Sequence, residues 1–376
     1  MDVITTVAAF LAILVVLVLV HEIGHFIAAK LAGITVEEFG VGFPPRAASV
    51  MFRGTRYSLN WIPLGGFVRM LGEDGDVEIR RLRENGLADE EIERAMQGAF
   101  NRKPIWIRIA VLVAGVLMNF LLAVVLFAGL AAMPQPYSAG PLEVLSVQED
   151  SPAEGVLEVG DVIVAADGRT FERSRDLTAY ITEKAGEPVT LTIVRDGQEM
   201  QVTVTPRELT QEEIEAGRGP IGFGWRSQRI GEDPPLATGP VDALRWGVVT
   251  TVEVAVQIPA GLARAVGGLL GLSPEGAGDA RGPIGIAQIT GEVIDSGILA
   301  VMQFVALLSV NLAVLNVLPF PPLDGGRVAV VLLEAARRRR LPAEREAFIY
   351  LAGFAVLIAL VILISIQDIQ RIISGG

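Results

Sequence analysis

The sequence predicts a polytopic α-helical membrane protein with about four transmembrane helices, an inserted α+β domain and a membrane-associated β-hairpin. Three observations carry this prediction. First, 51% of the 376 residues are hydrophobic and the mean hydropathy is +0.49, which is too apolar for an ordinary soluble protein. Second, four apolar stretches approach or exceed the ~20 residues that a transmembrane helix needs. Third, a long polar region with alternating β-rich runs separates the second stretch from the third.

The four apolar stretches are residues 4–31, 105–132, 298–318 and 346–366. The chain begins Met1-Asp2-Val3-Ile4, which lacks the positive region of a secretory signal, so we expect the first stretch to be retained as a span. The predicted segments are the first span (1–34), a loop with the hairpin (35–103), the second span (104–133), the inserted domain (140–207), a linker with a surface helix (208–297), the third span (298–326), a basic loop (327–345) and the fourth span (346–368).

The distribution of arginine predicts the orientation of these spans. The loops after the first and third spans are arginine-rich, and basic loops stay on the cytoplasmic side. Both termini and the inserted domain are therefore expected outside the cytoplasm. The arginines concerned are Arg46, Arg53, Arg56, Arg69, Arg80, Arg81 and Arg83 in the first loop, and Arg327, Arg337, Arg338, Arg339, Arg340 and Arg345 in the second.

The inserted region 140–207 alternates in the manner of β-strands. VTLTIVRDGQEMQVTVTP contains Asp196-Gly197, a strong hairpin signal, and SRDLTAYITEKAG predicts a short helix. The run SPAEGVLEVGDVIVAADG resembles the core of a PDZ domain. That resemblance implies a domain that adds a peptide strand to an exposed sheet edge.

Two further segments have less decisive patterns. RYSLNWIPLGGFVRM (56–70) alternates around Pro63 and Gly65-Gly66, which favours a cytoplasmic-side hairpin dipping into the membrane. Residues 208–240 are polar and rich in Gly and Pro, as in a linker. Residues 241–272 are semi-apolar and interrupted by Pro259, and they fit a helix on the outer membrane surface or a plain connecting helix.

His21-Glu22-Ile23-Gly24-His25 interrupts the first span with the pattern H-E-x-x-H. Two histidines four residues apart share one helix face and can bind one Zn²⁺, while Glu22 lies beside that face and can accept a proton from the attacking water. The chain has only these two histidines. The alternative is a pair of histidines that hydrogen-bond inside a helix bundle.

A catalytic zinc usually takes three protein ligands. With no third histidine and no cysteine, the third ligand must be a carboxylate. Asp324, in NVLPFPPLDGG at the end of the third span, is favoured because prolines forbid continuous helix there, and irregular backbone at this depth must line a cavity or be buried. Glu292, Asp295 and Glu334 are weaker candidates, and a simple cytoplasmic turn capped by Asp324 is the structural alternative.

Composition excludes several classes of function. The formal net charge of −12 argues against nucleic acid as a partner. The absence of cysteine excludes disulfides, thiolate metal sites and cysteine nucleophiles.

HEIGH in the first span and NVLPFPPLDGG in a later span together resemble the site-2 protease family of intramembrane zinc metalloproteases. The resemblance covers most of the chain, including GPIGIAQ (282–288), and is greatest with the bacterial branch that trims anti-sigma factors and signal-peptide remnants. It implies Zn²⁺ held by His21, His25 and Asp324, Glu22 as the general base, and Asn316 as a substrate- or transition-state-binding amide. The sequence departs from the family at AGVLMN (114–119), where a glycine-proline pair is usual, and only one PDZ-like unit is evident.

The resemblance also implies how substrates are handled. A transmembrane substrate must be held extended for cleavage, so the hairpin around Gly65 and Gly66 is expected to pair with it as an added strand. The PDZ-like domain is expected to gate or tether substrates already shortened by another protease, in the bacterial inner membrane. Two rival functions remain open on sequence grounds: a non-catalytic membrane PDZ scaffold, and a metal transporter.

Overall fold

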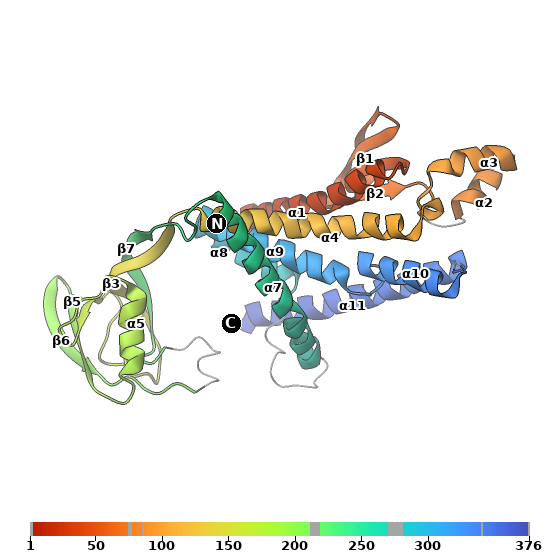
Figure 1. The fold of residues 1–376 in the computed structure, drawn as a ribbon. Helices are drawn as coiled ribbons and strands as arrows, with labels where there is room; N and C mark the ends of the chain where they lie inside the picture. Colours follow the sequence, from red (N-terminus) through yellow and green to blue (C-terminus); the bar gives the residue numbers. More distant parts are fainter. Residues whose placement is uncertain are drawn as a thin grey trace. The chain divides into compact units, whose positions relative to one another are not determined.

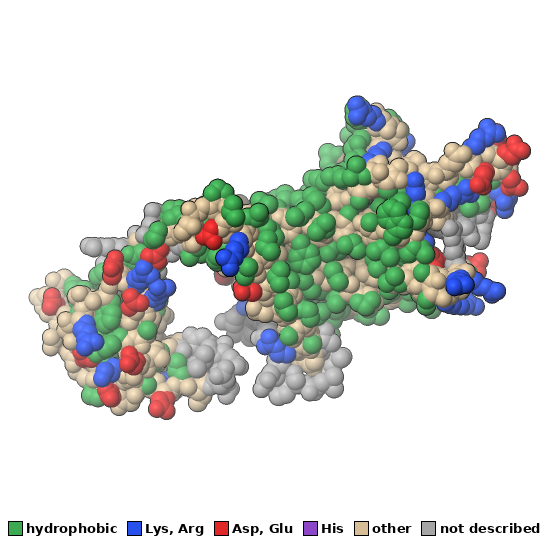
Figure 2. Space-filling view, in the orientation of Figure 1, with side chains coloured by type: hydrophobic (Ala, Val, Ile, Leu, Met, Phe, Trp, Pro, Cys, Tyr) green, Lys and Arg blue, Asp and Glu red, His purple; other side chains and the backbone are tan. Residues whose placement is uncertain are grey.

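The computed structural model describes residues 3–73, 77–84, 86, 88–210, 219–269, 281–339 and 341–374. The chain divides into two compact units (Figure 1). The membrane unit comprises Met1–Ala132 and Ala237–Gly376, and the PDZ-like unit comprises Met133–Leu236. Figure 2 shows apolar side chains covering much of the helical bundle, as expected for a surface that faces lipid.

Within the described residues, five helices are long and apolar enough to cross a membrane, one more than the sequence predicts. Four of them correspond to the four apolar stretches. The fifth is formed by the region assigned to a surface or connecting helix. The five helices are α1 (Val3–Leu31), α4 (Ile105–Ala131), α7 (Pro240–Leu269), α9 (Ile298–Val317) and α11 (Ala343–Ser374).

Helix α7 packs into the bundle instead of standing apart from it. Val254, Ala255 and Ile258 contact the buried cluster that α4 and α9 form. Gly247 lies so close to α4 that a Cβ there would be 2.4 Å from the carbonyl oxygen of Val124. The charged residues in α7 and its internal Pro259 weaken the apolar signal, which is why the sequence pattern understates this helix.

Helices α1 and α4 run antiparallel through the bundle. His25 lies beside Val111, and Gly24 lies beside Ala114. Two shorter helices pack in the same unit: α8 (Pro283–Asp295) and α10 (Asp324–Arg337). Arg108 pairs with Glu334, which fastens the start of α4 to α10.

Strands β1 (Val36–Phe52) and β2 (Thr55–Met70) form a folded sheet whose turn is at Arg53-Gly54. The sequence pattern placed the bend at Pro63–Gly66. There, however, β2 passes from one side of β1 to the other, because Val41 pairs with both Leu59 and Gly66. The sheet therefore has four segments in the order 46–52, 55–60, 36–43, 66–70, and the segment 66–70 is an edge among the described residues.

Short helices follow β2 within the predicted loop 35–103. They pack through Met96 and Ile92, which are buried with Leu71. The ion pair between Glu73 and Arg327 ties this region to α10. The helices are α2 (Val77–Glu84), α3 (Asp89–Ala95) and the 3₁₀ turns η1 (Met96–Gly98) and η2 (Phe100–Arg102).

Among its described residues, the PDZ-like unit is a five-stranded antiparallel sheet with helix α5. The strand order is β6-β5-β4-β3-β7, so β7 is an edge strand. Leu142, Ile163 and Leu191 are fully buried in a core with the helix residue Ile181. The elements are β3 (Gln135–Val147), β4 (Val162–Ala166), α5 (Ser174–Glu183), β5 (Val189–Arg195), β6 (Gln198–Val204) and β7 (Phe223–Asp233).

The unit is wider than the predicted range 140–207. Strand β7 lies in the stretch assigned to a linker, and it pairs with β3 from Gln135↔Asp233 to Val147↔Phe223. The linker assignment is therefore wrong for residues 223–233. Their glycines and charged residues are typical of a linker. They nevertheless form a strand because β3 supplies the hydrogen-bond partners, and this long-range pairing cannot be recognised from the local composition.

Candidate metal centre

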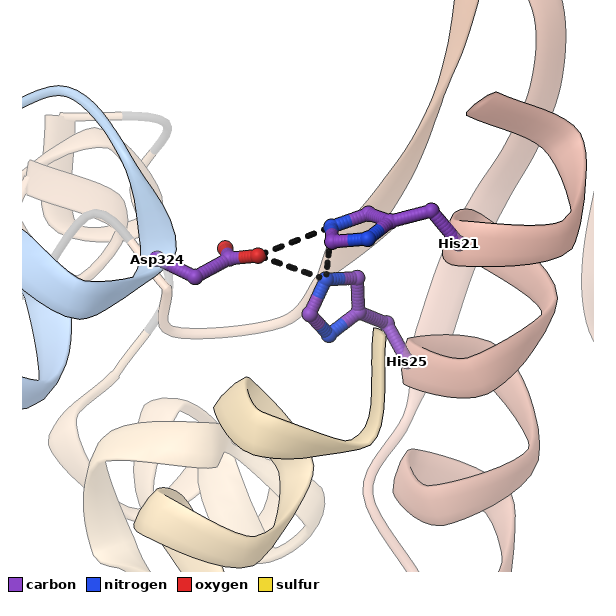
Figure 3. Close-up of side chains that lie close together, drawn as sticks. All are labelled: His21, His25 and Asp324. Atoms are coloured by element: carbon purple, nitrogen blue, oxygen red, sulfur yellow. Dashed lines mark hydrogen bonds and ion pairs between the residues drawn. The ribbon is translucent and has the colours of Figure 1, made fainter. Parts of the chain in front are cut away.

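The two histidines of HEIGH project from one face of α1 into the bundle (Figure 3). Only about 7% of His21 and 6% of His25 remain exposed. Their Nε2 atoms lie 3.1 Å apart. The spacing of four residues produces this convergence, because it places both side chains on the same helix face.

Asp324 reaches the same point from the first residue of α10. Its Oδ2 atom lies 2.8 Å from His21 Nε2 and 3.2 Å from His25 Nε2. The amino end of a helix favours negative charge, so a carboxylate is well placed in the first turn of α10. The three side chains, 303 residues apart in sequence at the widest, thus meet at one point.

The second nitrogen of each imidazole also has a partner. His25 Nδ1 lies 2.8 Å from the carbonyl oxygen of Val111, which fixes Nδ1 as the donor and turns Nε2 inward. His21 Nδ1 lies 3.3 Å from the amide nitrogen of Asn119. Partners of this kind orient histidine side chains in metal sites.

Gly115 on α4 makes room for the two imidazoles. A Cβ at this position would lie 2.4 Å from His25 Nε2 and 2.8 Å from His21 Cε1. Gly24 has the reciprocal role on α1, since its Cβ would meet the carbonyl oxygen of Ala114 at 2.4 Å. The segment AGVLMN (114–119) therefore allows α4 to approach the histidines closely, although it lacks the glycine-proline pair that is usual in the site-2 protease family.

The proline-rich loop after α9 folds tightly against the start of α10. Cβ atoms on Gly325 and Gly326 would collide with the backbone of Val317 and Phe320 at 2.3 and 2.7 Å. The two glycines after Asp324 are thus required for the loop to turn back and place the carboxylate.

Asn316 and Asp324 line one cavity of about 320 Å³ between α4, α9 and α10. The Asn316 amide donates one hydrogen bond to the carbonyl oxygen of Leu312, at 2.9 Å, and has a second N–H group. The other walls of the cavity are almost entirely apolar and comprise Leu112, Val113, Val116, Val317, Pro319, Gly325, Val328, Ala329 and Leu332.

Glu22 lies next to the edge segment of the sheet. A Cβ on Gly66 would be 3.6 Å from Glu22 Cγ and 2.9 Å from the carbonyl oxygen of Gly40. Gly65 adopts a φ of +123°, a conformation that favours glycine. These two predicted substrate-binding glycines therefore bring the backbone of β2 close to the side chain of Glu22.

The three convergent side chains fit a catalytic zinc. Two imidazole nitrogens and a carboxylate oxygen, all within 4.8 Å of one another, form a donor set that zinc enzymes use. Within the part of the chain that the structure describes, no other group of three His, Cys, Asp or Glu residues converges in this way. Among the weaker candidates, Glu334 instead pairs with Arg108 at 3.2 Å.

Comparison with known proteins identifies the family. The model of peptidase family M50 matches residues 9–360. The chain belongs to peptidase family M50. This M50 chain is 29% identical over 433 residues to the regulator of sigma-W protease RasP of Bacillus subtilis, with 98% of this chain and 99% of that protein covered. It is 35% identical over 356 residues to a relative from Clostridium perfringens, also classed by name among the zinc metalloproteases, with 94% and 95% covered.

Among solved structures, the PDZ domain of an SdrC-like protein from Listeria innocua is 28% identical, with 24% of this chain and 97% of that chain covered and a TM-score of 0.21. The family membership makes this chain an intramembrane zinc metalloprotease, as the resemblance to site-2 proteases predicts.

Three residues that support the M50 centre escape sequence reasoning. Val111 contributes only its carbonyl oxygen, Gly115 contributes the absence of a side chain, and Asn119 reads as an isolated polar residue in a span. The four-residue spacing of Gly115 and Asn119, which puts both on one face of α4, is the signal that could have indicated them.

Proposed function

We propose that His21, His25 and Asp324 hold Zn²⁺ and that Glu22 is the general base for hydrolysis of peptide bonds within or near transmembrane segments. The single observation that carries this assignment is the convergence of the two Nε2 atoms and Asp324 Oδ2 within 4.8 Å. Purified wild type and Glu22→Gln test it. Both variants are expected to contain zinc, and only the wild type is expected to cleave a membrane substrate.

The residues divide the chemistry between them. When bound, zinc polarises the scissile carbonyl and increases the acidity of water. Glu22 accepts the proton of the attacking water and passes it to the leaving amine. The second N–H group of Asn316, on the cavity that Asp324 also lines, donates to the scissile carbonyl oxygen as negative charge develops.

The edge segment 66–70 holds the substrate in an extended conformation. A helical substrate hides its carbonyls in intrahelical bonds, whereas a strand added to a sheet edge presents them. The closeness of Gly66 to Glu22 supports this placement, because a strand paired at this edge would pass beside the general base.

Proline substitutions test the edge. Phe67→Pro and Val68→Pro are compared because neighbouring strand residues direct their N–H groups to opposite sides. The variant that removes an outward donor should cut a helical substrate about tenfold more slowly, the equivalent of one lost hydrogen bond. Val50→Pro in the opposite edge segment 46–52 is the control. The proposal fails if both folded variants cut that substrate at the wild-type rate.

The PDZ-like unit gates or tethers substrates that another protease has already shortened. Edge strand β7 and helix α5 border a groove of about 120 Å³, which supports the addition of a peptide strand there. Its lining includes Ile181 on α5 with Ile221, Phe223 and Trp225. Deletion of residues 133–236 distinguishes the two roles: a gate predicts that unshortened substrates are cut, and a tether predicts slower cutting.

We place the protein in the bacterial inner membrane with four crossings, and with the PDZ-like unit, both termini and α7 on the extracytoplasmic side. The segment that contains α7 begins at the carboxyl end of α4, where Ala237 bonds to Ala131, and it continues into α8, which contacts Thr6 near the amino end of α1. Since α1 and α4 are antiparallel, both places lie at one end of the bundle.

The cysteine-free sequence allows a direct test of this orientation. Single cysteines at Ala263 in α7 and at Arg338 after α10 should react from opposite sides with a membrane-impermeant maleimide. Labelling of both from the same side would overturn the proposed topology.

Substrates of the anti-sigma-factor or signal-peptide type fit this arrangement, since each presents one membrane segment after an earlier cut. The name of the Bacillus subtilis relative, regulator of sigma-W protease, supports the first type. Comparison of membrane-protein fragments between cells with wild type and cells with Glu22→Gln would identify them.

A further inference from the structure

Asn119 is completely buried in α4 and directs its amide at the outer nitrogen of His21. Its Nδ2 atom lies 3.3 Å from His21 Nδ1. The Asn119 Oδ1 atom is also buried, and within the described residues it has no hydrogen-bond partner. A buried amide oxygen without a hydrogen-bond partner costs about 1–3 kcal/mol, so this orientation of the amide carries an energetic penalty.

The orientation of the Asn119 amide is linked to the position of the proton on the His21 ring. An amide nitrogen only donates, so with Nδ2 facing His21 the ring accepts at Nδ1 and carries its proton on Nε2. Nε2 then donates to Asp324 Oδ2 at 2.8 Å. A zinc ligand needs the opposite tautomer, with Nε2 free of hydrogen and the proton on Nδ1.

Rotation of the Asn119 amide by 180° about its χ2 bond would provide an acceptor for that second tautomer. The turn brings Oδ1 to the position 3.3 Å from Nδ1, where it accepts the N–H hydrogen bond. Few other side chains of this size offer both a donor and an acceptor, since leucine offers neither and aspartate only acceptors. The backbone of Asn119 is held independently, because Ser309 Oγ donates to its carbonyl oxygen at 2.8 Å.

We propose that Asn119 is a positioning residue that supports both tautomers of His21, with its amide turned so that Oδ1 accepts from Nδ1 when His21 binds zinc. Asn119 does not touch the substrate. It acts through the ring it orients, as the outer partners of metal-bound histidines do. The inference rests on the proposed zinc-ligand role of His21.

The test measures metal binding by the full-length protein. Zn²⁺ affinity is determined by competition with a chelator for wild type, Asn119→Leu and Asn119→Asp. The leucine variant should bind Zn²⁺ about 10–100-fold more weakly, the usual effect of losing such a partner. The aspartate variant keeps the acceptor and should bind at least as tightly as wild type. The visible spectrum of the Co²⁺-loaded protein should change in the leucine variant only.

Controls separate this effect from loss of the site or of the fold. His25→Ala should abolish binding, and if it does not, the proposed ligand set fails and not the role of Asn119. Asn311→Leu removes an exposed amide that bonds to Leu307 within α9, and it should bind zinc as wild type does. Asn119→Ala replaces the leucine variant if the latter misfolds. Equal affinities in wild type and the leucine or alanine variant, or equal losses in these and the aspartate variant, would overturn the proposal.

Discussion

Two carboxylates in this protein, one buried and one half-buried, have opposite surroundings. Asp161 in the PDZ-like unit is 1% exposed and receives hydrogen bonds from the Arg195 guanidinium at 2.7 Å and from the backbone N–H of Glu158 at 2.8 Å. Asp324 in the membrane unit faces the Nε2 atoms of two imidazoles, and no arginine in the described part of the chain forms an ion pair with it. The first carboxylate is paired with a guanidinium cation, whereas the second faces two imidazoles, side chains that can themselves bind a metal ion.

This difference separates a structural carboxylate from a ligand. The charge of Asp161 is balanced by a permanent cation, and its hydrogen bonds fasten the segment before β4 to strand β5. The charge of Asp324 faces nitrogens of two imidazoles, side chains that commonly bind zinc, so this arrangement suits a divalent cation. Exchanging each carboxylate for an amide should therefore impair different properties of the protein.

Asp324→Asn should have the largest effect. Zn²⁺ affinity should fall by more than about a hundred-fold, because even partners outside the coordination sphere are worth 10–100-fold, and proteolysis should be lost with it. Zinc content after dialysis against a chelator measures this. Retention of zinc would remove Asp324 from the ligand set.

Glu22→Gln should lower the rate of cleavage by about 10²–10⁴-fold, the range for loss of a general base. The zinc content should stay at the wild-type value, because Glu22 is not among the converging donor atoms. Comparison of Glu22→Gln with Asp324→Asn therefore distinguishes the loss of proton transfer from the loss of metal binding. Parallel loss of zinc in both variants would contradict this division.

Gly115→Ala should reduce Zn²⁺ affinity by at least about tenfold, since the new Cβ would lie 2.4 Å from His25 Nε2 and must displace the ring. Gly261→Ala in α7 is the matched control, because a Cβ there has no neighbour within 4 Å. Equal zinc affinity in the two variants would show that α4 does not constrain the histidines.

Asp161→Asn should leave zinc binding unchanged and lower the free energy of unfolding of the PDZ-like unit by about 2 kcal/mol, the scale of hydrogen bonds to a charged group. Burial by itself raises the pKa of Asp161, but Arg195 and the Glu158 N–H outweigh it and hold that pKa below its usual range.

The pH dependence of the same variant follows from that direction. A lowered folded-state pKa stabilises the unit above the unfolded pKa of about 4, and this contribution is lost as the pH falls through the folded pKa. The difference in thermal midpoint between wild type and Asp161→Asn should therefore shrink below about pH 4. A constant difference down to pH 2 would contradict the ion-pair explanation.

The smallest expected effect concerns substrate choice. Ala329→Phe narrows the apolar cavity that Asp324 lines, so cleavage next to large apolar side chains should fall about tenfold relative to cleavage next to alanine. Ala336→Phe, exposed on the same helix, is the control. Unchanged relative rates would show that the cavity does not receive the substrate.

The sequence predicted those parts of the protein that depend on local pattern. Spacing within HEIGH and the prolines before Asp324 were enough to bring His21, His25 and Asp324 into one hypothesis, because each motif constrains its own backbone. Strand β7 was missed because its partner β3 is some 90 residues away and supplies the hydrogen bonds. Asn119 and Val111 were missed for the same reason, since their roles depend on which face of α4 meets α1.

The doubled pairing of the segment 36–43 has a consequence for the breadth of substrates. Residues Glu38–Val41 of this segment pair on both sides, so an added strand cannot join the sheet there, and the edges at 46–52 and 66–70 remain open among the described residues. A polypeptide that joins the edge beside Gly66 is held by main-chain amides, which are alike in every amino acid except proline. Many unrelated membrane segments should then be accepted, provided that they unwind.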